Sequence, residues 1–329
     1  MAGPPTSRAP ITVPGIGLDL DVEFDHEAEG ARTRMWRELR RDPGFWTGAI
    51  TVLTLVILAA GAGLISPYDP DLAIRGRGLA ANGDPLGPTA EFPLGTDRLG
   101  RDYLSRLLHG ARTSLIVGIG ANFVASLLGA AVGGTAAFVG TAHLSFRVGG
   151  RRLNVSLPVE TFLMRLTDVV LSLPALLLAI ALVAVVGPSL LLVLIVIAGL
   201  LWTVTARIVY NRVRLLREFE FVVAARALGA PTARILLRHV APHVASLIVV
   251  YATLGIAASV LLEAVLSFLG VGVPPPAASW GTMIAEHAGY FRTDPRLLVL
   301  PGVGIMIIVL AFNLLGDALR DALDPRSWK

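Results

Sequence analysis

The sequence contains no cysteine, a single lysine at position 329, and few charged residues of any kind (16% of 329). Without cysteine, neither a disulfide framework nor a thiolate metal site can form. A P-loop needs a lysine beside its glycine-rich turn to reach nucleotide phosphates, and Lys329 follows no such turn. These absences exclude a disulfide-stapled scaffold, a cysteine-ligated metalloprotein and an ATPase with a P-loop of its own.

Apolar residues are abundant where charged ones are scarce. They make up 54% of the chain, and the mean hydropathy of +0.69 is higher than in water-soluble domains. A bilayer core of ~30 Å takes roughly 20 apolar residues in a helix. Runs of that length cover residues 45–65, 114–140, 161–210, 244–270 and 296–316. Because 161–210 is long enough to cross twice and has Gly187 and Pro188 at its centre, the sequence predicts an all-α, polytopic membrane protein with six transmembrane helices.

The predicted membrane domain, residues 45–316, is flanked by two polar tails. Residues 1–44 begin with a stretch rich in proline, glycine and acids (1–31), which we expect to be disordered, and end in a basic juxtamembrane segment. The stretch has no apolar core of the kind found in a cleavable signal peptide. Residues 317–329 form the other predicted tail, and the long loops within the domain are 66–110 and 211–243.

Arginine is concentrated in alternate loops. Short cytoplasmic loops of membrane proteins carry an excess of positive charge, and the arginine-rich segments here are 32–41, 147–152, 207–238 and 320–329. The remaining loops, 66–110 and 271–295, balance acids against arginines. The pattern predicts cytoplasmic N and C termini and an extracytoplasmic loop 66–110. Short basic clusters beside apolar runs suit a membrane face better than a nucleic-acid-binding surface.

The second apolar run has glycines one helical turn apart, at Gly129 and Gly133. Two small residues at this spacing let another helix approach closely. The pair could promote dimerisation, but packing inside a helix bundle is the more common use, and we favour it.

The loop 211–243 has a helical pattern of its own, and we call it the elbow. Its apolar residues recur at helical spacing on both sides of an interruption at Gly229, Ala230 and Pro231. The pattern predicts two short helices joined by a turn. The arginines of the elbow could lie on anionic lipid or dock into an acidic cleft of a cytoplasmic partner.

Here the sequence resembles a known family, the permease subunits of bacterial ATP-binding-cassette importers. Their elbow motif is Glu-Ala-Ala, three residues, Gly, nine residues, then Ile-x-Leu-Pro. Ala224, Ala225, Gly229 and Pro242 stand at the matching positions, whereas Val223, His239 and Ala241 depart from the motif.

Four further segments are similar to the second, C-type permease of the branch that carries dipeptides, oligopeptides or nickel. They are LGTDRLGRDYLSRLLHGARTSL (94–115), MRLTDVVLSLPALLLAIAL (164–182), LSFLGVGVPPPAASWGTMI (266–284) and LAFNLLGDALRDALDP (310–325). Together with the elbow, the resemblance covers most of residues 45–326.

The resemblance implies a type I importer permease in the bacterial plasma membrane, with an elbow that seats in an ATPase subunit and transmits its closure to the helix bundle. The coupling residues that it implies are Ala224, Ala225, Arg226, Leu228, Gly229, Ala230 and Pro242. It implies a second, different permease subunit, two ATP-binding subunits or domains, an extracytoplasmic substrate-binding protein, and surrounding lipid. ATP and Mg would be bound by those partners, so we expect neither a cofactor nor a catalytic site in this chain.

The sequence places three ionisable residues at membrane depth. Arg165 and Asp168 are three apart near the inner end of the third span, where an ion pair between them is favoured over contact with substrate. Glu263 would lie about 28 Å along the fifth span, near its outer boundary. It could line a gate, but a carboxylate that pairs or reaches water is the more common case.

The same residues bear on a metal site and on two alternative functions, a secondary transporter and a membrane-embedded enzyme. His239 and His243 are four apart, which could place two metal ligands on one helix face, but two ligands are too few and a structural role is favoured. A secondary transporter driven by an ion gradient, the alternative function, would need polar groups near the membrane midplane. A membrane-embedded enzyme would need a cluster of His, Asp or Glu at one depth. Spans one, two, four and six contain almost no such groups.

Overall fold

The computed structural model of the chain describes residues 11–12, 19–20, 33, 35–74, 76–148 and 151–323. Most of the tail 1–31, predicted to be disordered, lies outside the described residues. Within it, the strands β1 (Ile11–Thr12) and β2 (Asp19–Leu20) pair antiparallel.

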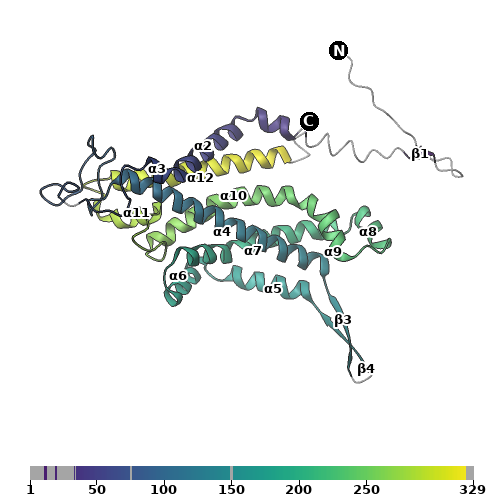
Figure 1. Cartoon of the computed structure of the whole chain (residues 1–329). Helices are drawn as coiled ribbons and strands as arrows, with labels where there is room; N and C mark the ends of the chain where they lie inside the picture. Colours follow the sequence, from purple (N-terminus) through teal and green to yellow (C-terminus); the bar gives the residue numbers. More distant parts are fainter. Residues whose placement is uncertain are drawn as a thin grey trace, which may run out of the picture.

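The described part of the chain is a bundle of long helices, as predicted (Figure 1). In chain order, the elements after β2 are α2 (Pro43–Ala60), α3 (Ala62–Ile65), α4 (Tyr103–Val139), β3 (Ala142–Val148), β4 (Arg151–Leu157), α5 (Val159–Ser172), α6 (Ala175–Val186), α7 (Leu190–Leu216), α8 (Glu220–Ala227), α9 (Thr232–Arg234), η1 (Ile235–Val240), α10 (Ala241–Phe268), α11 (Trp280–His287), η2 (Ala288–Tyr290) and α12 (Arg296–Leu323).

Five of these helical segments are long and apolar enough to cross a membrane: α2, α4, α7, Thr232–Phe268 and α12. The sixth predicted span is present as a bent pair, α5 and α6, whose axes differ by 89°. The chain turns where Pro174 follows Leu173, which is extended with ψ 134°. A proline disfavours helical geometry at the residue before it, so the third predicted span is a helix pair bent at Pro174 and not one straight helix. The predicted break at Gly187 is confirmed, and its φ of 93° is one that glycine adopts readily.

Three helices extend beyond the predicted spans. α4 begins at Tyr103, eleven residues before the apolar run, because the Asp102 side chain caps it by accepting a hydrogen bond from the Ser105 backbone N–H at 2.7 Å. α7 continues to Leu216, and α12 continues to Leu323. Part of the predicted tail 317–329 is therefore helical, and its last residues lie outside the described part.

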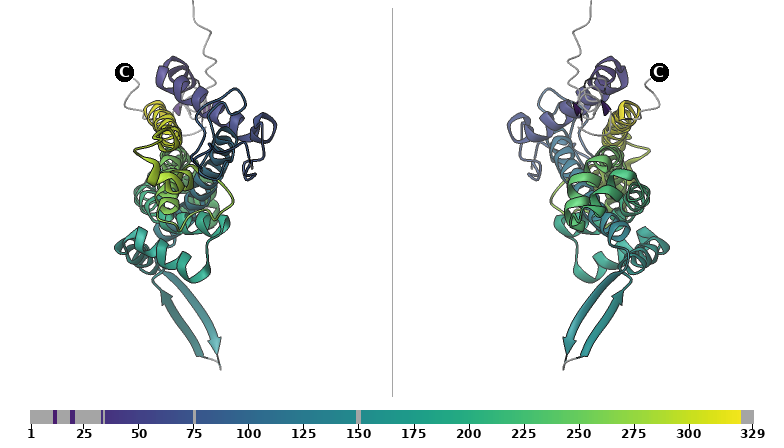
Figure 2. Two further views of the ribbon diagram at one scale, coloured as in Figure 1. Left: turned by 90° about the vertical axis from the view of Figure 1, so that its left-hand side faces the viewer. Right: turned by 90° about the vertical axis from the view of Figure 1, so that its right-hand side faces the viewer.

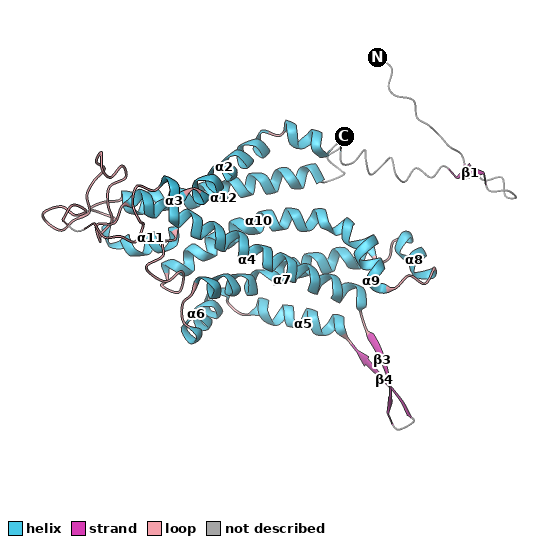
Figure 3. Ribbon diagram, in the orientation of Figure 1, coloured by secondary structure: helices cyan, strands magenta, loops and turns pink. Residues whose placement is uncertain are grey.

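An antiparallel hairpin, β3 and β4, interrupts the all-α pattern that the sequence predicted (Figure 3). Its register runs from Ala142 opposite Leu157 to Val148 opposite Arg151. Gly149 and Gly150, between the two strands in the sequence, lie outside the described residues. The hairpin points away from α2 and α12 in both end-on views (Figure 2).

α4 and α7 approach closely where the two glycines singled out in the sequence lie. A Cβ atom on Gly129 would come within 2.5 Å of the Trp202 carbonyl oxygen, and one on Gly133 within 2.2 Å of the Ala206 carbonyl oxygen. The glycines therefore let two helices of the same chain touch through their backbones. Packing within the bundle, the favoured interpretation, is confirmed.

The arginine-rich segments share one end of the bundle. The start of α2, the end of α12, the hairpin and the elbow lie at that end, whereas α3, α11 and the loop 66–102 lie at the other (Figure 1). This arrangement agrees with the alternation of basic and balanced loops from which the topology was predicted.

We predict that Gly133→Ala will destabilise the bundle by roughly 1–3 kcal/mol, the usual cost of overpacking a filled site. Gly134→Ala is the matched control, because a Cβ there meets nothing within 4 Å. The measurement is the thermal midpoint of the purified complex. Equal midpoints for the two variants would contradict the close approach of α4 and α7.

Candidate functional site

The elbow contains one short helix, α8, closed by a glycine turn. Gly229 has a φ of 78°, and its N–H donates to the Arg226 carbonyl at 3.0 Å. The Ala230 N–H donates to the Ala225 carbonyl at 3.1 Å. These two bonds form a Schellman motif, in which a residue with positive φ ends the helix and satisfies its last carbonyls. The prediction that Gly229 ends this helix at a turn is confirmed.

One face of α8 is anchored to the bundle. Val222 is buried, and Ala225 and Ala230 are partly buried against a cluster that includes Phe138 from α4 and Val213 from α7. The aromatic ring of Phe138 also lies 5.7 Å below the Arg226 guanidinium. Because α8 packs on two of the long helices, a force on α8 would be passed to both.

The opposite face of α8 is exposed. Ala224 and Gly229 are exposed away from the cluster, and Leu228 at the tip is 88% exposed. Arg226 is also exposed, but it lies at the edge of the anchored face, over Phe138. α8 ends at Ala227, and Leu228 directly after it projects from the end of the helix. The elbow thus presents an apolar tip and small residues at the end of the molecule.

The predicted second short helix of the elbow is not separate. Residues 232–268 form one continuous helical segment, with the π-helical stretch η1 just before Pro242. The ring of Pro242 would clash with the carbonyl four residues earlier in an α-helix, and a π-helical turn is one way for a helix to accommodate such a residue. The helix therefore continues through Pro242, which lies between His239 and His243.

His243 does not take part in a metal site within the described residues; its ring lies 5.3 Å from that of Phe221. The structural role favoured for the histidine pair fits this contact.

A buried ion network lies at the other end of the bundle, and sequence reasoning missed it. Its members are Asp71, Asp97, Arg101, Arg106 and Glu286, from the loop 66–102, α4 and α11. The Arg101 guanidinium donates to Asp97 at 2.5 Å and to Glu286 at 2.8 Å. The Arg106 guanidinium, fully buried, donates to Glu286 at 3.1 Å and lies 3.5 Å from Asp97. The network joins segments about 180 residues apart in the chain.

His287 adjoins this network. Its Nδ1 lies 2.7 Å from the Met283 carbonyl oxygen, so Nδ1 carries a proton and donates it. Its Nε2 is buried without a hydrogen-bond partner among the described residues. Burial lowers the pKa of His287, although the Asp97 and Glu286 carboxylates act against that shift.

Asp97, Glu286 and His287 also form the one group in the described ranges whose ligand atoms lie within 4.8 Å of one another. A divalent cation here would add two positive charges beside two guanidinium groups that already neutralise the carboxylates. Such an excess of buried charge is unfavourable. We therefore assign an ion-pair network, not a metal centre, to this group.

Glu263, predicted to pair or reach water, does neither within the described structure. It is fully buried in α10 and accepts hydrogen bonds from Ser114 Oγ of α4 at 2.9 Å and Ser267 Oγ at 2.7 Å. Ser114 Oγ in turn accepts from the Trp280 backbone N–H at 3.2 Å. The carboxyl group therefore links α4 and α10 to the start of α11. The serines that satisfy it carried no recognisable signal in the sequence.

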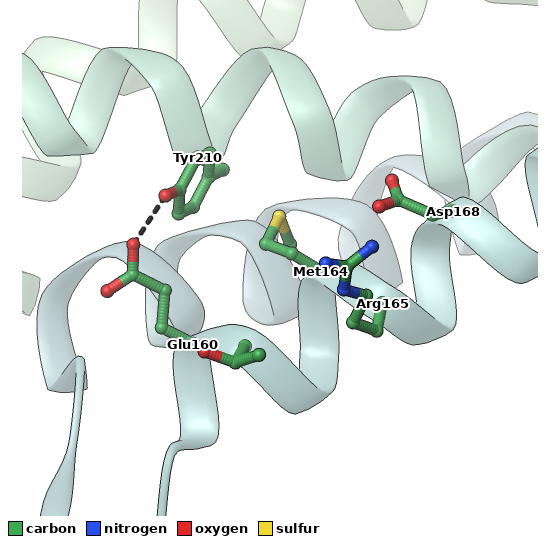
Figure 4. Close-up of a pocket in the computed structure, with 6 residues that line it drawn as sticks. Glu160, Met164, Arg165, Asp168 and Tyr210 are labelled. Carbon is green, nitrogen blue, oxygen red and sulfur yellow. Dashed lines mark hydrogen bonds between the residues drawn. The ribbon is translucent and has the colours of Figure 1, made fainter.

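The predicted ion pair of Arg165 with Asp168 was also wrong. Asp168 pairs with Arg207 of α7 instead, and Arg165 has no hydrogen-bond or ion-pair partner among the described residues. Neighbouring helices compete for a carboxylate, and an i,i+3 spacing on one helix does not settle which cation reaches it. Arg165 and Asp168 line a groove between α5 and α7 together with Glu160, Thr161, Met164 and Tyr210 (Figure 4).

Two family models match the chain. The model described as the inner membrane component of binding-protein-dependent transport systems matches residues 142–329. The model described as the N-terminal transmembrane domain of oligopeptide transport permease C matches residues 32–85.

Curated relatives match over most of their length. The di/tripeptide transport system permease protein DppC of Pseudomonas aeruginosa is 38% identical over 293 residues, which cover 88% of this chain and 91% of that protein. The glutathione transport system permease protein GsiD of Escherichia coli is 38% identical over 291 residues, with 88% and 89% covered. Among solved structures, the inward-facing MetNI methionine ABC transporter is similar in fold, with a TM-score of 0.52 at 19% identity over 67% of this chain and 97% of that chain.

We predict that Arg106→Ala will cost up to about 3–5 kcal/mol in stability, because it removes one of the two cations that neutralise the buried carboxylates. Arg98→Ala is the control: Arg98 lies in the same loop region but is exposed. Thermal unfolding of the purified complex measures both. A loss for Arg106→Ala no larger than that for Arg98→Ala would show that the network contributes little.

A second prediction concerns pH. Because burial lowers the pKa of His287 below its ordinary value of about 6.5, the unfolded chain takes up a proton at this residue before the folded chain does. Stability should therefore fall as the pH drops below about 6.5. His287→Gln should make the thermal midpoint less dependent on pH between 7 and 5.5, and an unchanged slope would remove His287 as the cause.

Proposed function

Because this chain belongs to the family of inner-membrane components of binding-protein-dependent transport systems, we propose that it forms half of a path for short peptides and that its elbow receives work from a separate ATPase. The chain is a permease subunit of an ATP-binding-cassette importer and crosses the inner membrane several times. The alternative, a secondary transporter driven by an ion gradient, finds no support in these relatives.

The coupling proposal rests on the exposed tip of the elbow. Leu228 is 88% exposed and Val223 53% exposed, at the end of the bundle that carries the arginine-rich segments. Burial of one such side chain is worth about 1.5–3 kcal/mol, and an apolar patch rimmed by polar residues is typical of an interaction site. The small side chain of Ala224 beside the tip would permit a partner to approach closely.

The anchored face of α8 supplies the second half of the argument. Val222 and Ala225 hold α8 against α4 and α7, so an ATPase groove that grips the tip would move those helices with it. Pro242 starts α10 from the same elbow. In this proposal Ala224, Arg226, Leu228 and Gly229 face the ATPase, while Ala225, Ala230 and Pro242 join the elbow to the bundle.

The assignment of ATP binding to partner subunits follows from the lack of a P-loop lysine in this chain. The chain has no P-loop lysine, so we assign ATP and Mg to two ATP-binding partner subunits or domains and no catalysis to this chain. We also propose a second, different permease subunit and an extracytoplasmic substrate-binding protein. The elbow and both termini would then be cytoplasmic, as the arginine distribution favours.

The proposed substrate is a short peptide. The relatives at 38% identity are named for di/tripeptide and glutathione transport, and glutathione is itself a tripeptide. We therefore propose peptides of two or three residues as the cargo of this importer.

We predict that Gly229→Val will uncouple transport from ATP hydrolysis, because a β-branched residue resists the φ of 78° that closes α8. Gly229→Asn is the matched control, since asparagine tolerates positive φ and a Cβ at this position meets nothing within 4 Å. In vesicles that hold the whole complex, peptide moved per ATP should fall severalfold for Gly229→Val. A complex that assembles and transports normally with Gly229→Val would refute the coupling role.

A further inference from the structure

The groove between α5 and α7 has a volume of about 210 Å³ and lies near the elbow end of both helices. Glu160, Arg165 and Asp168 follow one another along α5 and face α7 (Figure 4). Tyr210 of α7 donates a hydrogen bond to Glu160, and Arg207 of α7 pairs with Asp168. Acid, base and acid thus alternate along one wall.

These charges are open to the surroundings. The side chains of Asp168 and Arg207 are 45% and 51% exposed, although both lie on helices that belong to the membrane domain. A charged residue that faces hydrocarbon costs about 2.5–3.5 kcal/mol on insertion scales, and such residues almost always face a bundle interior or a water-filled cavity. The groove therefore faces water or a polar partner and not lipid tails.

The unpaired charge and the unused hydrogen-bond acceptor of the groove complement a zwitterion. Arg165 is a cation without an acidic partner among the described residues, as its absence from every ion pair there shows. Glu160 uses one carboxylate oxygen for Tyr210 and keeps acceptor capacity on the other. An ammonium group would be bound by Glu160, and a carboxylate by the guanidinium of Arg165.

The spacing of the two groups fits a short peptide. Five helical residues separate Glu160 from Arg165, an axial rise of about 7.5 Å, and their side chains leave α5 about 140° apart, so the two charged groups lie at opposite edges of the groove. An extended chain spans about 3.3–3.6 Å per residue, so a peptide of two or three residues, with a hydrogen bond at each end, can bridge the groove. The groove volume is smaller than the ~300 Å³ of a typical small-molecule pocket, which suits an open station on a path better than an enclosed site.

We propose that this groove is a station in the inner half of the transport path, where Glu160 binds the amino terminus and Arg165 the carboxyl terminus of a short peptide. Tyr210 and Arg207 are positioning residues, which hold the Glu160 and Asp168 carboxylates in the groove wall. The inference rests on the proposal that the importer carries peptides.

The first test asks whether the groove faces water. Because the chain has no cysteine, Thr161→Cys introduces the only thiol of this subunit. In the whole complex in inside-out vesicles, a membrane-impermeant thiol reagent should label it rapidly. Phe162→Cys is the matched control: Phe162 is the next residue on α5, 68% exposed, but does not line the groove. Labelling of Thr161→Cys no faster than that of Phe162→Cys would overturn the proposal.

The second test uses dialanine, N-acetyl-dialanine and dialaninamide as probes that protect Thr161→Cys from the reagent. The substrate-binding protein is left out of these vesicles, so it cannot compete for the probes. Dialanine should protect at concentrations roughly tenfold lower than either derivative, since each derivative lacks one charge-assisted contact. Adding Arg165→Gln should remove the advantage of dialanine over dialaninamide and leave its advantage over N-acetyl-dialanine. Arg37→Gln, which removes an exposed arginine outside the groove, should change neither.

The outcomes separate the two proposals. Equal protection by all three probes, or protection that Arg165→Gln does not alter, would overturn the groove while leaving peptide transport intact. If the wild-type complex moves no peptide in an ATP-driven assay yet dialanine protects as expected, the proposed function fails and the groove stands as a zwitterion site.

Discussion

Hydrocarbon offers no hydrogen-bond partner to a polar group, and this constraint orders the whole molecule. Arginine-rich segments gather at one end of the bundle, and the charges at the other end are paired in a buried network around Arg106. The carboxyl group of Glu263, deep among helices, is satisfied by two serine hydroxyls. The exposed pair of Asp168 and Arg207 lies toward the arginine-rich end, and the same constraint marks the α5–α7 groove as a place where water or substrate is expected.

A single helix connects the functional features. α4 begins within the buried ion network, passes the Glu263 cluster at Ser114, meets α7 closely at Gly133, and ends against α8 through Phe138. Its 37 residues span about 55 Å at helical rise. A helix that is held at both ends and meets α7 backbone to backbone at Gly129 and Gly133 has little room to absorb a displacement locally. In the proposed function, a push on the elbow would thus reach the opposite end through α4.

The features that the sequence predicted are those written in short, local patterns. Apolar runs located the membrane helices, Gly229 located the turn of the elbow, and the spacing of Gly129 and Gly133 predicted close packing. The features that were missed depend on how the helices and loops pack, which decides the partner that each side chain meets. Asp168 could pair with either of two arginines, and only the position of α7 decides for Arg207. The partners of Glu263 are ordinary serines on other elements, and the residues of the ion network come together only when loop 66–102 folds over α11. The bend at Pro174 was visible as a proline, but an apolar run on both sides of it concealed the break.

The proposal that the elbow engages an ATPase is tested most directly by cross-linking from its tip. A photoreactive p-benzoylphenylalanine in place of Leu228, in an intact complex within native membranes, should capture an ATP-binding subunit, identified by mass spectrometry. The same substitution at Leu64, which is 94% exposed at the other end of the bundle, should capture none. Capture of lipid alone from position 228, in a complex that still transports, would contradict the coupling role of the elbow.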